Sequence, residues 1–310
     1  MTDPFTSLFV TPAQLHAALA EARSSSGPRV IPLVAGRNSN VESFESQHVP
    51  GSRFFNMDLI RDTASPYPMM LPTASQFARF MSHLRIRPED ILVIYDPLEP
   101  GFYSSPRVAW TCQYFGHHAV HILNTFPKYV QEGYPVSSGS VRECLTAPTA
   151  EHPAEMSYPE RPVPDTNRVI SFEELSKTLM DPSHTTTAGE VKLQILDSRP
   201  SGRFAGPVDT DLSVLPRGHI PSAVNVPFSS LLGPEKTVWS PRELADLLVK
   251  AGVKEGVPTV VYCNTGVTAA GLDIALQASG LTLETRLYDG SWSEWTKRAD
   301  PKSMLASTGS

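Results

Sequence analysis

The chain contains only three cysteines among its 310 residues, Cys112, Cys144 and Cys263. Three thiols cannot form the paired framework that stabilises small secreted domains, and they lack the spacing of zinc ligands. The sequence therefore predicts a reducing compartment in which a free thiol persists. It predicts no metal site and no cofactor.

The sequence also lacks long apolar runs and an excess of basic charge. No stretch approaches the ~20 consecutive apolar residues that cross a bilayer, and the net charge of -6 gives no sign of a nucleic-acid surface. The first residues, MTDPFTSLFVTPAQ, show neither a secretory nor a transit peptide pattern. We therefore expect no membrane association and no directly bound nucleic acid. A cytoplasmic or mitochondrial location is expected, and the missing presequence favours the cytosol.

Residues 137–165 are rich in proline, serine, threonine and glutamate and have no helical or strand periodicity. This composition is typical of a linker between domains. The length of the chain suggests about two domains. The sequence therefore predicts an N-terminal domain over residues 1–136 and a C-terminal domain over residues 166–310.

The same order of features occurs on both sides of the predicted linker. The turn GHIPSAVNVPF in the second half corresponds to QHVPGSRFFNMD in the first, and the buried strand PTVVYC corresponds to DILVIYD. Helical patterns alternate with these strands, as in parallel α/β sheets. We therefore expect two homologous α/β domains, each with a mostly parallel sheet flanked by helices.

Cys263 ends the apolar strand PTVVYC. A cysteine at a strand end is usually a packing residue, because free cysteine is among the most buried residue types. In open α/β sheets, however, ligands bind beyond the carboxyl ends of the strands. Residues 264–268 turn the chain toward the start of a predicted helix. Their N–H groups and the hydroxyls of Thr265 and Thr268 can donate hydrogen bonds to a negative charge on the Cys263 sulfur. The position therefore predicts a nucleophile that needs no general base.

The loop CNTGVTAAG resembles the active-site loop of the rhodanese family, specifically of its tandem-domain thiosulfate and 3-mercaptopyruvate sulfurtransferases. Further motifs match that family in the same order along nearly the whole chain outside the linker: HVPGSRFF, SPYPMMLP, DSRPSGRFAG, GHIPSAVNVPF and YDGSWSEW. The resemblance implies two rhodanese-like domains with the catalytic loop in the C-terminal one. Asp96 stands where the first half would have its cysteine, which agrees with an inactive N-terminal domain.

The resemblance implies that the Cys263 thiolate takes sulfane sulfur from a small-molecule donor and becomes a persulfide. A thiol, thioredoxin or cyanide then removes the sulfur. The amides of the loop would hold the persulfide as an oxyanion hole holds its charge. The residues implied for catalysis are Cys263, Thr265 and Asp58. Those implied for substrate binding are Arg203, Asn264, Gly266, Val267, Thr268 and Arg199.

The residues after the cysteine bear on the donor. Asn264 and Thr265 are neutral, whereas family members specialised for thiosulfate have basic residues there. Arg203 matches the family's substrate-binding arginine, which suits a carboxylate donor. The expected donor is 3-mercaptopyruvate, and the alternative is thiosulfate. Leu212 and Met69 depart from the mercaptopyruvate type, at the positions of a second substrate arginine and of a relay histidine.

Other functions fit the sequence less well. A Cys-dependent phosphatase needs an arginine six positions after the cysteine, where this chain has Ala269. A thiol protease needs a histidine placed beside the cysteine, and no local motif supports one. A non-catalytic binding module with a rhodanese fold remains an alternative. For Arg203 the alternative is a structural ion pair, with Asp197 or another acid. Arg199 fits a structural role and a substrate role equally, and His219 is expected to fix the geometry of its turn.

Overall fold

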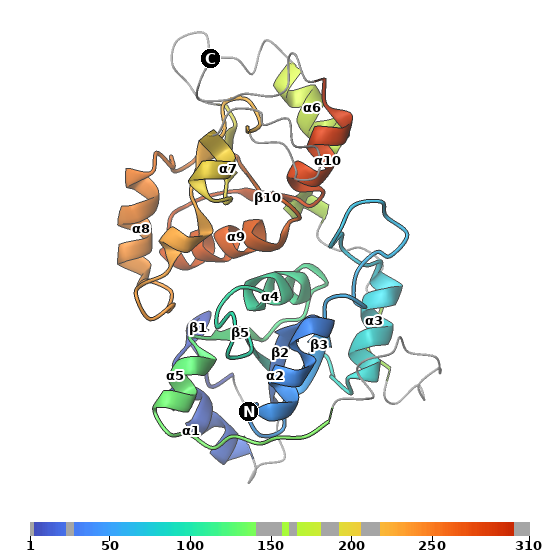
Figure 1. Cartoon of the computed structure of the whole chain (residues 1–310), viewed down its shortest axis with the longest axis vertical. Helices are drawn as coiled ribbons and strands as arrows, with labels where there is room; N and C mark the ends of the chain where they lie inside the picture. The colour runs from blue at the N-terminus through green and yellow to red at the C-terminus, as the bar shows by residue number, and fades with distance from the viewer. Residues whose placement is uncertain are drawn as a thin grey trace. The chain divides into compact units, whose positions relative to one another are not determined.

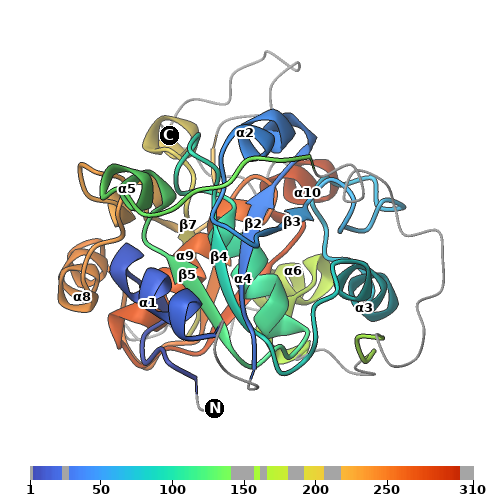
Figure 2. The ribbon, with the colours of Figure 1, turned by 90° about the horizontal axis from the view of Figure 1, so that it is seen from below.

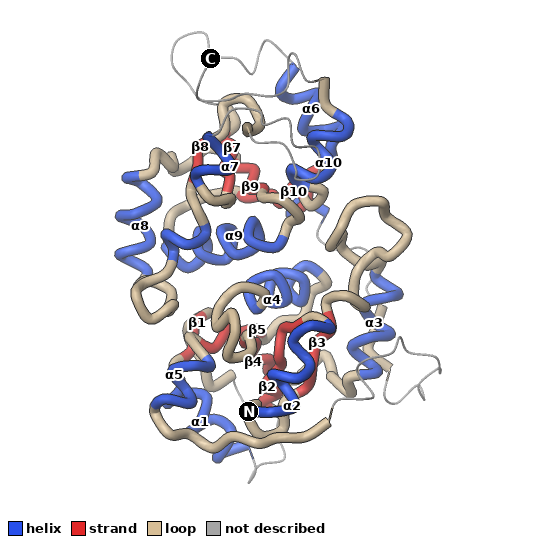
Figure 3. Tube along the Cα trace, viewed as in Figure 1, coloured by secondary structure: helices blue, strands red, loops and turns tan. Residues whose placement is uncertain are grey.

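The computed structural model describes residues 3–22, 28–140, 157–160, 166–180, 192–205 and 218–300. The chain divides into two compact units, each built around one sheet (Figure 3). The first unit comprises Met1–Ala64, Leu71–Asp165 and Pro234–Thr237, and the second comprises Ser65–Met70, Thr166–Gly233 and Val238–Ser310. Most of the predicted linker lies outside the described residues, as does the position of Leu212.

The first unit contains a five-stranded sheet with the order β1-β5-β4-β2-β3, in which every paired neighbour is parallel. Figure 2 shows β5, β4, β2 and β3 following one another across this sheet. Its elements are β1 (Phe9–Val10), α1 (Pro12–Ala22), β2 (Val30–Gly36), α2 (Val41–Ser46), β3 (Arg53–Asn56), α3 (Ala74–His83), β4 (Ile91–Tyr95), α4 (Ser105–Tyr114), β5 (Val120–Leu123) and α5 (Phe126–Gln131).

The second unit repeats this arrangement with the order β6-β10-β9-β7-β8, again parallel throughout. The prediction of two parallel α/β domains is confirmed. The elements of the second unit are β6 (Val169–Ile170), α6 (Phe172–Met180), β7 (Gln194–Asp197), α7 (Ser201–Ala205), β8 (Val224–Asn225), α8 (Pro241–Lys250), β9 (Thr259–Tyr262), α9 (Val267–Ser279), β10 (Thr285–Tyr288) and α10 (Ser291–Arg298).

Helices cover both faces of each sheet (Figure 1). In the first unit, residues of α1, α2 and α5 share one apolar core with the sheet, and α4 lies on the opposite face. In the second unit, α6 and α10 share a core with one face, and α8 and α9 pack together on the other. A parallel sheet covered on both faces needs strands that are apolar throughout, which explains the continuous apolar runs of β4 and β9. Among the described residues, no helix has the length and hydropathy to cross a bilayer.

A tyrosine at the end of the central strand holds the turn motif of each unit. The Tyr95 hydroxyl accepts the N–H of Val49 at 2.9 Å, and the Tyr262 hydroxyl accepts the N–H of Ile220 at 3.1 Å. Both turns are thereby tied to the strand end that precedes residue 96 or 263. In each unit, the repeated strand motif and the repeated His-containing turn are thus joined by a hydrogen bond to the tyrosine.

Candidate active site

Cys263 directly follows β9, and its side chain is buried, with 2% of the residue exposed. Gly266 has a φ of +78°, a left-handed conformation that favours glycine, and α9 begins at the next residue, Val267. The first N–H groups of a helix have no partner within the helix, and the helix dipole adds positive potential there. The loop therefore brings Cys263 to a helix N-terminus that suits an anion.

The beginning of α10 contacts this loop through its backbone and two hydroxyls. The N–H of Trp292 donates to the Cys263 carbonyl at 2.9 Å, and the N–H of Ser293 donates to the Asn264 carbonyl at 3.0 Å. The Ser293 hydroxyl donates to the same Asn264 carbonyl at 2.7 Å. The Ser291 hydroxyl accepts the N–H of Cys263 at 3.2 Å. Every one of these bonds is made by the backbone of the cysteine loop, and none by its side chains.

A second hydroxyl pair lies on the side of β7. Ser198 Oγ is 2.9 Å from Thr268 Oγ1, and the N–H of Ser198 donates to the Tyr262 carbonyl at 3.0 Å. Ser198 is buried. It thereby orients the Thr268 hydroxyl at the first turn of α9. Ser198, Ser291 and Ser293 were not predicted as site residues, although each lies in a motif, DSRPSGRFAG or YDGSWSEW, that resembles the family.

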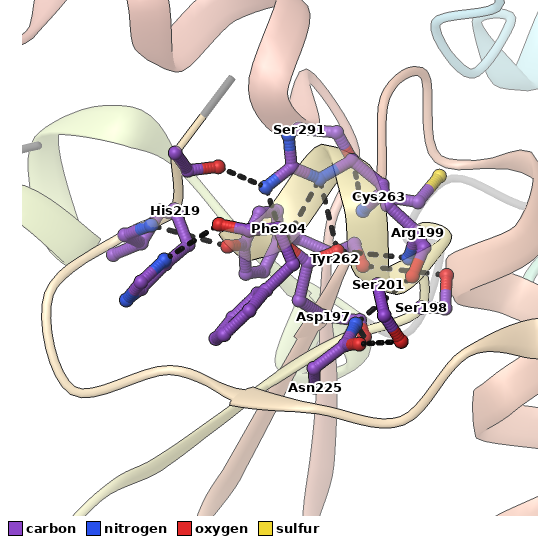
Figure 4. A network of polar contacts seen from close by, with 12 residues as sticks. Asp197, Ser198, Arg199, Ser201, Phe204, His219, Asn225, Tyr262, Cys263 and Ser291 are labelled. Atoms are coloured by element: carbon purple, nitrogen blue, oxygen red, sulfur yellow. Dashed lines mark hydrogen bonds and ion pairs between the residues drawn. The ribbon is translucent and has the colours of Figure 1, made fainter. Parts of the chain in front are cut away.

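Arg199 has the contacts of a structural residue, and its role in substrate binding stays a prediction. Only 2% of the residue is exposed, and its guanidinium is 2.5 Å from the Asp197 carboxylate and donates to the Gly218 carbonyl at 2.6 Å. The guanidinium also lies over the ring of Trp292, with its central carbon 4.3 Å from the ring centroid. Burial alone would lower the pKa of Arg199, but the hydrogen bonds and charge of Asp197 raise it. Figure 4 shows this network, with the Cys263 sulfur outside it.

Arg203 lies on α7 and is partly exposed. Within the described part of the chain, no hydrogen bond or ion pair involves its guanidinium, so the ion pair with Asp197 that the sequence allowed does not form. Its backbone is fixed instead, because its carbonyl accepts the N–H of Gly218 at 3.2 Å. His219 stacks on Phe204, with ring centroids 3.9 Å apart, and its Nδ1 lies 3.0 Å from the Phe204 carbonyl. The structural role expected of His219 agrees with these contacts.

The remaining predicted residues divide between the two units. Asn264, Thr265 and Thr268 are half-buried and lie on the cysteine loop or the start of α9. Asp58 belongs to the first unit, where Arg37 pairs with its carboxylate at 2.7 Å and the N–H of Asn38 donates to it. Burial opposes ionisation of Asp58, but the hydrogen bond from Arg37 lowers its pKa. Its predicted role in catalysis stays a prediction.

The first unit carries a carboxylate at the position of the cysteine. Asp96 directly follows β4 as Cys263 follows β9. Its carboxylate accepts the N–H groups of Tyr103, Ser104 and Ser105, at 2.9, 2.6 and 2.9 Å, at the beginning of α4. Burial raises the pKa of Asp96, and these donors oppose that rise. In this unit the N–H groups after the strand therefore bind the carboxylate of Asp96, where the second unit has the thiol of Cys263.

Replacing Asp96 with alanine is expected to lower the free energy of unfolding of the first unit by about 2 kcal/mol, because it leaves buried N–H groups without an acceptor. Asp96→Asn keeps one acceptor oxygen and should cost less. Thermal unfolding of both variants measures the difference, and Glu132→Ala, at an exposed position of the same unit, serves as the control. An Asp96→Ala variant as stable as this control would show that the three contacts contribute nothing.

The described residues contain no group of three or more His, Cys, Asp or Glu side chains that could hold a metal ion. Of the two cysteines described, Cys112 is completely buried in α4, and burial raises the pKa of its thiol. Its surroundings differ from those of Cys263, because no loop of backbone amides follows it. Cys263 is thus the described thiol whose position suits nucleophilic chemistry.

Comparison with known proteins gives consistent matches. Residues 173–298 match the model of the rhodanese-like domain. The chain is 34% identical to human 3-mercaptopyruvate sulfurtransferase over 272 residues, which cover 87% of this chain and 84% of the human protein. It is also 34% identical to thiosulfate sulfurtransferase TUM1 of Saccharomyces cerevisiae over 275 residues, which cover 86% of this chain and 85% of the yeast protein.

Two solved structures extend the similarity to three dimensions. The crystal structure of Tum1 from Saccharomyces cerevisiae matches with a TM-score of 0.80 and 31% identity, and the match covers 97% of this chain and 98% of that chain. The structure of SseA from Escherichia coli, described among 3-mercaptopyruvate sulfotransferases, matches with a TM-score of 0.72 and 28% identity, over 93% of this chain and 99% of that chain.

Proposed function

The chain belongs to the rhodanese family of sulfurtransferases, and from this premise we propose that it moves sulfur from 3-mercaptopyruvate through a persulfide on Cys263. The observation that carries the proposal is the position of Cys263 beyond β9, at the loop that begins α9. Sulfur transfer itself follows from membership of the family. The donor, the acceptor and the residues that act are the proposed part.

The first half-reaction forms one S–S bond and breaks one C–S bond. The Cys263 thiolate attacks the sulfur of 3-mercaptopyruvate, and the electron pair of the C–S bond passes to the substrate carbon. This carbon fragment leaves as the enolate of pyruvate and takes a proton at its methylene carbon, while the protein keeps the sulfur as a cysteine persulfide. The loop amides stabilise the persulfide charge where it forms.

The second half-reaction returns the enzyme to its starting state. An acceptor thiolate attacks the outer sulfur of the persulfide and leaves with it, and the Cys263 thiolate is regenerated. A small thiol or a thioredoxin-type protein would leave as a persulfide, and cyanide would leave as thiocyanate. No oxidant or reductant is consumed in either half of this double displacement.

The choice of donor rests on charge around the loop. The relatives named for mercaptopyruvate and for thiosulfate match this chain at the same identity, 34%, so identity does not decide between them. Asn264 and Thr265 give the loop no side-chain cation for the dianion thiosulfate. The guanidinium of Arg203 has no hydrogen-bond or ion-pair partner among the described residues, and it can form two parallel hydrogen bonds with one carboxylate. This distribution favours a donor with a single carboxylate.

The proposed acceptor and compartment are less specific. A persulfide on a nearly buried cysteine suits a small or extended thiol, and a protein acceptor would present its cysteine at the loop. We place the reaction in a reducing compartment, the cytosol or the mitochondrion, since Cys263 must stay a free thiol. A structure 27% identical to this chain is described as a yeast mitochondrial complex I sulfur transferase subunit.

The donor proposal is tested by steady-state kinetics of the wild-type protein and Arg203→Ala with each donor and a thiol acceptor. We expect wild-type kcat/KM to be higher for 3-mercaptopyruvate than for thiosulfate. Arg203→Ala should lower kcat/KM for mercaptopyruvate about 10- to 100-fold, since a hydrogen bond to a charged group contributes ~1.5–3 kcal/mol. Arg242→Ala, an exposed arginine on α8, is the matched control. Higher kcat/KM with thiosulfate would identify thiosulfate as the donor instead.

A further inference from the structure

The N-terminal turn of α10 holds the cysteine loop by its backbone, and we propose that Ser291 and Ser293 are positioning residues that aim the loop amides at the Cys263 sulfur. The inference rests on the proposed persulfide chemistry of Cys263 and adds two residues to it. Neither serine follows from the position of the cysteine in the sequence, because they lie 28 and 30 residues later, on another helix.

Ser291 is oriented so that its oxygen faces the cysteine. Its hydroxyl donates to the Tyr288 carbonyl at 2.8 Å, so the hydrogen is used and a lone pair is left to accept the N–H of Cys263 at 3.2 Å. The residue is completely buried. The peptide between Tyr262 and Cys263 is thereby held at both ends, because the Tyr262 carbonyl accepts the N–H of Ser198 on its other side.

Ser293 and the backbone of α10 hold the next two peptides. The Cys263 carbonyl accepts the N–H of Trp292, and the Asn264 carbonyl accepts both the N–H and the hydroxyl of Ser293. A trans peptide is planar, and its N–H points opposite to its carbonyl. Since both carbonyls point toward α10, the N–H groups of Asn264 and Thr265 point away from α10 and into the loop. Figure 4 shows the Cys263 side chain likewise turned away from Ser291.

The backbone at the start of α10 is strained in a way that supports this role. Ser291 has a φ of +50°, which a residue with a side chain rarely adopts and which costs ~1–2 kcal/mol. Glycine would adopt the same conformation without cost, but it has no hydroxyl. Position 290 favours glycine, because a Cβ there would lie 2.7 Å from Glu294 Cβ, which cannot swing away as the end of a side chain can. A serine kept at the strained position indicates that its hydroxyl is used.

The variants Ser291→Gly and Ser293→Ala test the proposal without a large loss of fold. Ser291→Gly removes the hydroxyl and relieves the strain at the same time. Ser293→Ala removes one of two donors to Asn264 and leaves the backbone bond in place. Thr296→Ala is the matched control, because the Thr296 hydroxyl donates to the Trp292 carbonyl within α10 at 2.9 Å and not to the described loop residues 263–268.

Three measurements on each variant separate positioning from stability. We expect each serine variant to lower kcat about fivefold, as the loss of ~1 kcal/mol of hydrogen bonding implies, with the KM of the donor unchanged. The pH at which Cys263 becomes half-reactive toward iodoacetamide should shift upward, and the loaded persulfide should decay faster. Thr296→Ala should behave as the wild type in all three, and thermal unfolding monitors the fold.

The proposal is overturned if both serine variants match Thr296→Ala in kcat and in the pH profile of alkylation. A loss of activity that follows the loss of thermal stability, with an unchanged alkylation profile, also overturns it and assigns the serines to folding alone. Failure of the wild-type protein to load sulfur would instead refute the proposed donor chemistry. The alkylation profile would still decide the positioning role in that case, because it needs no donor.

Discussion

Replacing Cys263 with serine is expected to abolish sulfur transfer from every donor and to leave the fold intact. The substitution changes one atom of a nearly buried side chain, so packing is retained. A serine hydroxyl ionises far less readily than a thiol, and an oxygen in place of Sγ cannot form the S–S bond of the persulfide. Removal of a covalent nucleophile typically costs several orders of magnitude in kcat, about 10⁶-fold in well-studied hydrolases.

The experiment combines kinetics with mass spectrometry. Wild-type protein incubated with donor should gain the mass of one sulfur atom on the peptide that contains Cys263, and Cys263→Ser should gain none. Cys112→Ala is the control, since Cys112 belongs to the first unit and is completely buried within α4. We expect it to keep full sulfur loading. Transfer activity that survives in Cys263→Ser would refute the persulfide mechanism as a whole.

Replacing Arg199 with methionine is expected to destabilise the second unit by about 3–5 kcal/mol. Methionine retains the apolar length of the side chain but leaves the Asp197 carboxylate buried without a counter-charge, and removing one partner of a buried pair costs in this range. The Gly218 carbonyl and the face of Trp292 lose their contact with the guanidinium as well. Asp197 also fixes the backbone after β7. Its carbonyl accepts an N–H of the Asn225 side chain, and its carboxylate accepts the backbone N–H of Arg199.

Thermal unfolding of Arg199→Met, Asp197→Asn and the double variant measures this coupling. The double variant should be more stable than the sum of the single losses predicts, since it removes the unpaired charge. Persulfide loading per folded molecule should stay near the wild-type level, because the guanidinium does not face the sulfur. A stable Arg199→Met variant with a raised KM for the donor would contradict the structural role and restore Arg199 as a substrate ligand.

Local sequence patterns were sufficient for the elements and for the position of Cys263, whose role as nucleophile stays a prediction. Apolar runs bounded by turn residues predicted the parallel strands, and a cysteine one residue past such a run predicted a reactive thiol. The prediction of the strands is confirmed, and the loop after β9 leads into α9 as expected, because strand burial and the position of a helix N-terminus are decided by residues within one loop of each other. The two neutral residues after Cys263 also bear on the donor without any knowledge of the fold, since they belong to the same loop.

Roles that depend on contacts between distant elements needed the structure. Arg199 and Arg203 lie four residues apart and looked alike in the sequence, but one is buried against Asp197 and the other has no charged partner among the described residues. Arg199 is held by Asp197, two residues earlier, whose carboxylate points to the same side of the end of β7. Sequence spacing cannot distinguish a side chain that turns inward from one that turns outward at the start of α7.

The sequence by itself determined that this protein has two homologous parallel α/β domains and that its one candidate nucleophile follows the central strand of the second. Only the tertiary structure decided what surrounds that nucleophile. Ser198, after β7, and Ser291 and Ser293, after β10, lie around the cysteine loop. In the first unit, the Asp96 carboxylate accepts backbone N–H groups at the start of α4. The physical reason is that hydrogen-bond partners of a backbone loop are chosen by position in space, and neighbouring strands of a parallel sheet are separated by whole helices in the sequence.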